Sequence, residues 1–139
     1  MVMRVVLLSL ALIAAGSSAF AQDRSPMLRQ TLVDLAYVLG ESHAIRQACS
    51  GAADQHWRLR MIAMVEAEQP DAALDRRLRE SFNTGFANRQ SEFRGCSSGT
   101  KRAETQAMAR GRSLAQRLAR AKANAVESPD SMAETEQVR

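Results

Sequence analysis

The side chains of this 139-residue chain that could do redox or thiol chemistry are two cysteines, Cys49 and Cys96. They could form a disulfide, a reactive thiol or part of a metal site. There is no C-x-x-C, and neither cysteine has a partner at metal-ligand spacing. A structural Cys49–Cys96 disulfide is therefore the favoured interpretation, in a compartment that permits one.

The two histidines, His43 and His56, are the candidates for metal binding or acid–base chemistry. With Glu41 and Asp54 they could be drawn as metal ligands, but there is no H-E-x-x-H, and Glu41 and His43 are wrongly spaced to share a helix face. Ser42 or Ser50 with His43 could be a nucleophile and its base, but no G-x-S-x-G surrounds them. We therefore predict no metal, no cofactor and no enzymatic activity.

Cationic and aromatic side chains near the cysteines are the candidates for ligand binding. The candidate contact residues are Arg46, Arg89, His43, Trp57 and Arg102. As a functional site they would form a cationic pocket with an aromatic wall for an acidic group. Alternatively, the arginines stabilise helix C-termini and cover apolar surface with their stems. Since Arg89 falls among phenylalanines, and a buried unpaired charge is costly, we predict that it pairs with a carboxylate.

The pattern of the first 21 residues indicates the compartment in which the protein folds. Arg4 is followed by an apolar run over 5–15 and by Ala19-Phe20-Ala21, which is the pattern of a secretory signal with an A-x-A cleavage site. The run is too short for a good membrane anchor. We expect residues 1–21 to be removed, and a periplasmic protein beginning at Gln22 without an integral membrane segment.

Apolar residues at helical spacing predict four helices after the signal, over about 25–48, 54–68, 70–94 and 100–126. Gly40 falls off the apolar face of the first and weakens that helix. In the last, the small-residue stripe runs from Ala103 to Ala125. Few aromatic and β-branched residues argue against a β-sandwich or barrel. Short connections favour an all-α, antiparallel up-down bundle, a domain over 22–126 followed by a disordered acidic tail over 127–139.

This topology also brings the cysteines together. The first and third helices run in the same direction, and Cys49 and Cys96 lie where these helices end. The chain-entropy model assigns about 4 kcal/mol to a bond that closes a loop of about 48 residues.

Positive charge is concentrated in the last helix. Residues 22–99 carry ten arginines and ten acids, whereas residues 100–126 carry seven bases and one acid. Four arginines form a strip beside the apolar stripe: Arg102, Arg110, Arg117 and Arg120. Export and scarce aromatics disfavour nucleic acid, and the small apolar face disfavours a helix lying on a membrane. A solvated face, or pairing with neighbouring acids or the tail, is the alternative to a binding surface.

The chain resembles a family of small secreted alphaproteobacterial proteins known only as a domain of unknown function. The segments that carry the resemblance are LVDLAYVLGESHAIRQAC, DQHWRLRM, FNTGFANRQSEF and AETQAMARGRSLAQRLA. The resemblance implies a signal-bearing helical protein with these two cysteines, and no activity, cofactor or catalytic residue.

Together these patterns predict a non-enzymatic periplasmic protein that acts by binding, as an accessory partner of an envelope protein or an acidic envelope component. One alternative is a cationic helical chaperone, which requires an exposed apolar concave surface. Another is an enzyme with a histidine-containing pocket, which requires an enclosed cleft around that histidine.

Overall fold

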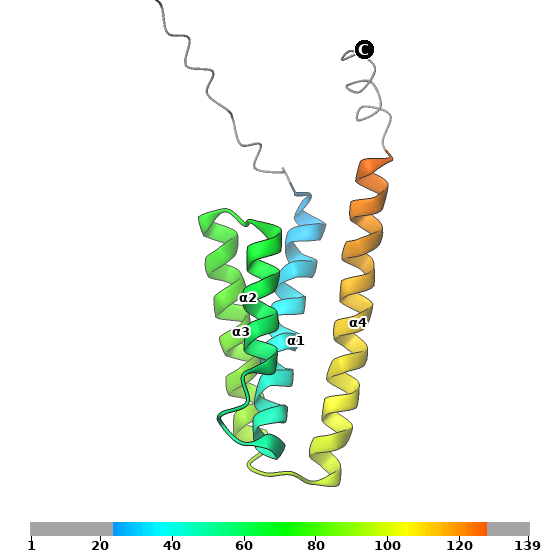
Figure 1. The fold of residues 1–139 in the computed structure, drawn as a ribbon. Helices are drawn as coiled ribbons and strands as arrows, with labels where there is room; N and C mark the ends of the chain where they lie inside the picture. The colour runs from blue at the N-terminus through cyan, green and yellow to red at the C-terminus, as the bar shows by residue number, and fades with distance from the viewer. Residues whose placement is uncertain (1–23, 128–139) are drawn as a thin grey trace, which may run out of the picture.

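The computed structural model describes residues 24–127, and within that range it contains four α-helices and no strand. They are α1 (Pro26–Ser50), α2 (His56–Glu68), α3 (Ala72–Glu92) and α4 (Ser98–Val126). Successive helices run in opposite directions, as predicted for an up-down arrangement (Figure 1). The predicted signal over 1–21 and nearly all of the predicted tail lie outside the described residues.

Local sequence accounts for the helix starts. The Ser25 hydroxyl accepts a hydrogen bond from the Leu28 amide at the start of α1. Asp71 caps α3 by accepting from the Leu74 amide at 2.8 Å. The Arg29 guanidinium, together with this amide, lowers the pKa of Asp71 to about 2. In α4, Ser97 begins a capping box whose other half is a threonine.

Helix α1 is the centre of the fold, because each of the other three helices packs extensively against it. Its side chains enter two hydrophobic clusters. The first unites all four helices and contains Leu32, Ala36, Leu39, Met61, Leu74, Leu78, Phe82 and Leu118. The second joins α1 to α4 and contains Val38, Ile45, Ala103, Ala107 and Leu114. Because α1 is covered on several sides, it can position polar side chains away from water.

The expectation that Gly40 lies off the buried face is wrong. Gly40 is buried where α1 crosses α3, and a Cβ there would lie 2.0 Å from the Phe82 carbonyl oxygen. On the other side of the crossing, a Cβ on Gly85 would lie 2.2 Å from the Tyr37 carbonyl oxygen. The two glycines therefore allow direct backbone contact between the helices.

The predicted Cys49–Cys96 disulfide is confirmed, with an S–S distance of 2.04 Å and a Cα–Cα distance of 4.4 Å. It joins the last turn of α1 to the short connection between α3 and α4. Both cysteines are exposed. The bond therefore stabilises one end of the bundle from its surface.

The small-residue stripe of α4 is confirmed in part. Ala103, Ala107, Leu114 and Leu118 are buried against the bundle, whereas Ala125 is exposed near the end of the helix. Within the described range, none of the four helices combines the length and apolar character needed to cross a bilayer.

Candidate functional site

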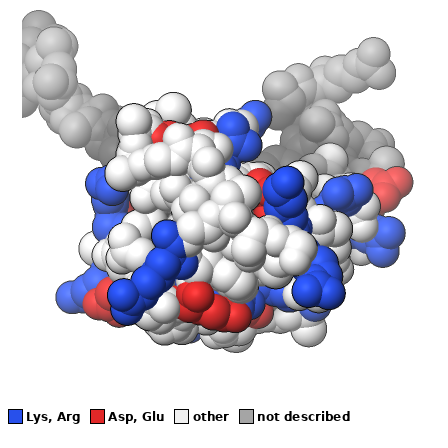
Figure 2. Space-filling view, turned by 90° about the horizontal axis from the view of Figure 1, so that it is seen from below, with Lys and Arg blue, Asp and Glu red and all other residues white. Residues whose placement is uncertain are grey.

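The five predicted contact residues have different partners in the structure. Arg46 forms an ion pair with Asp54 at 2.7 Å. Trp57 packs against the first hydrophobic cluster, and Arg102 is exposed on α4. Seen from the disulfide end, basic groups lie around the rim and uncharged atoms occupy much of the middle (Figure 2). The cationic pocket with an aromatic wall therefore stays a prediction, and the side chains proposed for it have the separate contacts described here.

Asp54 explains why Arg46 is not available as a free cation. Its carboxylate accepts a hydrogen bond from the His56 amide at 3.0 Å as well as the Arg46 bond. These two contacts lower the pKa of Asp54, the amide contributing most. Asp54 thus supports the start of α2 and neutralises Arg46.

His43 is a buried side chain, only 3% exposed. Its ring lies 5.8 Å from the ring of Phe82 and 5.3 Å from that of Phe86. Nε2 is 3.3 Å from the Gln47 amide nitrogen, whereas Nδ1 has no hydrogen-bond partner. Burial, helped by the charge of Arg58, lowers the pKa of His43 against the opposing effect of Asp54.

The lowered pKa of His43 predicts that acid destabilises the fold. Below pH 6.5 the unfolded chain binds a proton on this histidine while the folded chain does not. The free energy of unfolding therefore decreases as the pH is lowered from 6.5 to the folded-state pKa. Urea unfolding between pH 7 and 5 measures this. His43→Leu should flatten the slope, and the matched control His56→Gln, at an exposed histidine, should retain it. An unchanged slope in His43→Leu contradicts the prediction.

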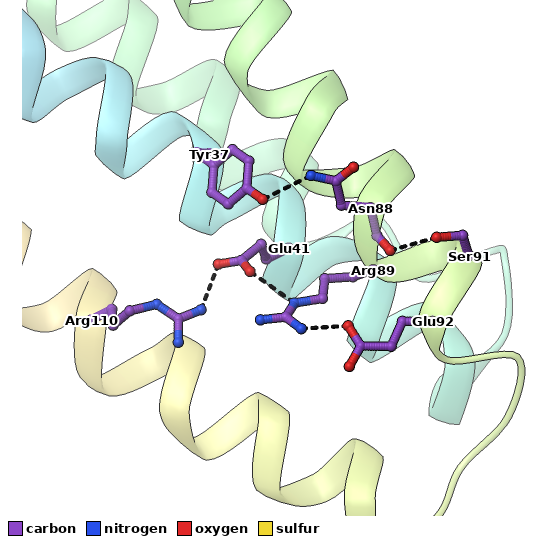
Figure 3. A network of polar contacts seen from close by, with 7 residues as sticks. All are labelled: Tyr37, Glu41, Asn88, Arg89, Ser91, Glu92 and Arg110. Carbon is purple, nitrogen blue, oxygen red and sulfur yellow. Dashed lines mark hydrogen bonds and ion pairs between the residues drawn. The ribbon is translucent and has the colours of Figure 1, made fainter.

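The central polar feature of the bundle is a carboxylate shared by two arginines. Glu41 on α1 is 3% exposed. Its Oε1 accepts from Arg89 Nε of α3 at 2.8 Å, and its Oε2 accepts from Arg110 of α4 at 2.5 Å (Figure 3). Arg89 also pairs with Glu92 and lies 5.9 Å from the ring centroid of Phe93. The prediction that Arg89 pairs with a carboxylate is confirmed.

This network borders a groove between α1 and α4 with a volume of about 460 Å³. Arg89 and Arg110 reach it from α3 and α4, and Arg117 lies one α4 turn beyond Ser113. Its apolar lining includes Val38 and Leu114. The groove thus combines guanidinium groups with an apolar wall.

A second buried carboxylate connects α4 to the opposite end of the bundle. Glu68, at the end of α2, forms ion pairs with Arg24 and with Lys122 of α4. Two of the bases counted in the last helix, Arg110 and Lys122, therefore pair with acids of neighbouring helices. This bears out the alternative of acid pairing for part of the basic segment.

Sequence reasoning considered Glu41 only as a metal ligand and missed its role in this network. Its position directly after Gly40 marks the α1–α3 crossing, but no local pattern indicates that α3 and α4 would both supply an arginine. Within residues 24–127 no group of three or more His, Cys, Asp or Glu side chains could hold a metal ion.

The buried network predicts that substitutions within it have non-additive effects on the free energy of unfolding. Arg89→Met leaves Glu41 with one of its two partners and should lower the free energy of unfolding by about 1–3 kcal/mol. The double variant Glu41→Leu/Arg89→Met removes the buried charge as well, so it should be more stable than Arg89→Met alone. Urea unfolding of both variants measures the difference. A double variant less stable than the single one contradicts this.

Comparison with known proteins places the chain in a family. The model of the family described as "Protein of unknown function (DUF2385)" matches residues 28–121, so the chain belongs to that family. The match covers all of α2 and α3 and most of α1 and α4. No curated protein and no solved structure matches the chain.

Proposed function

We propose that this protein is an exported, non-enzymatic binding protein that recognises an acidic component of the cell envelope through α4. The observation that carries the proposal is an exposed basic strip beside the buried face of this helix. Within the described part of the chain, Arg102, Arg117 and Arg120 have no ion-pair partner. Such a strip attracts anionic partners without being needed for folding.

The environment of α4 supports the same proposal. Among the helices that the structure describes, α4 packs extensively against α1 only, and most of its other side chains are exposed (Figure 1). Glu41 and Glu68 fix Arg110 and Lys122 to the bundle and thereby orient the helix. The strip is therefore presented on a rigid element, which lowers the entropic cost of binding.

Export is the second part of the proposal. It rests on the signal pattern over 1–21 and is supported by the Cys49–Cys96 disulfide, since such bonds persist in oxidising compartments. Fusing residues 1–21 to a reporter that is active only outside the cytoplasm tests it. Lack of reporter activity would refute export.

Immobilised protein and envelope extract test the binding surface. The double variant Arg102→Gln/Arg120→Gln should reduce the captured partner several-fold, because it removes two exposed cations that have no ion-pair partner among residues 24–127. Arg60→Gln/Arg76→Gln removes two exposed arginines from α2 and α3 and is the matched control. Equal capture by both variants would rule out α4 as the binding surface.

One observation favours a chaperone as a second candidate. On α2, Leu59 is 62% and Ile62 46% exposed. Ile62 lines a groove of about 380 Å³ between α2 and α3, together with Met61 and Phe82. Suppression of the aggregation of an unfolded envelope protein, lost in Leu59→Ser/Ile62→Ser, would favour this function over the basic strip.

A further inference from the structure

We infer that the groove between α1 and α4 binds an oxyanion, a carboxylate or a phosphodiester, carried by an apolar molecule. This inference rests on the proposed binding function and specifies a site within it. The oxyanion would lie between Arg89 and Arg110, and the apolar part along Val38 and Leu114. The groove volume of about 460 Å³ lies in the range of ligand sites.

The donors of the two arginines are the first argument. A guanidinium has five N–H donors, and Glu41 and Glu92 use only some of those on Arg89. The nitrogen of Arg89 that contacts neither carboxylate points toward Arg110 (Figure 3). Arg110 is bonded to Glu41 through one nitrogen, and its side chain is 44% exposed. Unused donors of both arginines therefore border the groove, in the fork geometry that suits oxyanions.

The burial of Glu41 is the second argument. A buried ion pair is often no more stabilising than apolar side chains of similar volume. The fold could therefore have closed the α1–α3–α4 junction without Glu41. What the carboxylate does is hold two like-charged guanidinium groups near each other at the edge of a groove. That arrangement positions them for an anion.

Polarity and hydrogen-bonding capacity define the ligand class. The groove lining contains three arginines and two carboxylates, Asp34 and Glu41, and Glu92 outside the lining also pairs with Arg89. The carboxylates therefore balance the arginines in charge, and a ligand oxyanion would be recognised through the N–H donors that they leave unused. Val38 and Leu114 are each 6% exposed, and with Tyr37 they form an apolar wall beside the charged groups. An alkyl or aryl group next to the oxyanion matches this wall.

Three probes test the inference on the purified chain: decanoate, dihexanoyl phosphatidylglycerol below its micellar concentration, and phosphatidylglycerol vesicles. Calorimetric titration should show saturable binding of decanoate or of the monomeric lipid, which identifies the oxyanion as carboxylate or phosphodiester. Arg110→Gln should weaken that binding about tenfold, the loss of one charge-assisted contact. The affinity of Arg110→Lys should lie between those of the parent protein and Arg110→Gln, because lysine keeps the charge but lacks the planar pair of guanidinium donors.

Arg117→Gln is the companion variant, since Arg117 has no ion-pair partner within residues 24–127 and its loss leaves the fold intact. It should weaken the same probe several-fold, whereas the control Arg60→Gln/Arg76→Gln should not. Binding to vesicles only, or equal binding by Arg110→Gln, overturns the groove site. Capture that depends on Arg102 and Arg120 would persist in that case, so failure of the groove is distinguishable from failure of the α4 surface.

Discussion

The double replacement Cys49→Ser/Cys96→Ser is expected to lower the free energy of unfolding by about 4 kcal/mol, because the bond closes a loop with a sequence separation of 47 residues. That is a large part of the 5–15 kcal/mol typical of a small domain. Urea unfolding of the variant and of the oxidised protein measures the difference.

Reduction provides an independent control for this prediction. Since both cysteines are exposed, dithiothreitol reaches the bond in the folded protein and should produce a loss of stability similar to that of the double variant. The reductant should leave the stability of the serine variant unchanged. If the oxidised and reduced proteins unfold at the same urea concentration, the prediction is wrong.

Gly40→Ala is expected to destabilise the fold by about 3 kcal/mol or more, the upper part of the range for overpacking. The added Cβ would lie 2.0 Å from the Phe82 carbonyl oxygen, which belongs to a helix backbone and cannot rotate away. The gain of about 1 kcal/mol in helix propensity offsets only part of this cost. Urea unfolding measures the loss of stability, and Gly85→Ala should behave alike.

Gly111→Ala is the matched control for the glycine variants. A Cβ at Gly111 would meet the side chain of Val38 at 3.4 Å, an ordinary van der Waals contact. This variant should therefore keep the stability of the parent protein or gain up to about 1 kcal/mol from helix propensity. Equal destabilisation at positions 40 and 111 would refute the close-approach argument.

Much of the architecture could be predicted because it depends on local patterns. Ser25 and Pro26 mark the start of α1, and the leucine spacing that follows has the helical period. The disulfide followed from the alternating direction of the helices combined with the positions of Cys49 and Cys96. These features need only the near neighbours of each residue and the order of the helices.

The candidate site was less predictable because it depends on contacts between distant residues. Arg89 could be expected to find a carboxylate, since an unpaired buried charge is costly, but its partner Glu41 is 48 residues away in sequence. The second partner of Glu41, Arg110, is 69 residues from Glu41. Gly40 was misjudged for a related reason. A face chosen from leucines on one helix does not reveal that a second helix approaches on another side.

The covalent connectivity at the disulfide end gives α1 and α4 an unexpected relationship. Residues 49–96 form a closed ring that contains α2 and α3, and α1 and α4 leave this ring from the two bonded cysteines. Although far apart in sequence, these helices are therefore arms of one covalent hairpin. Their separation can change only at the end remote from the sulfur atoms, and a single cut between α2 and α3 would leave both arms in the same molecule.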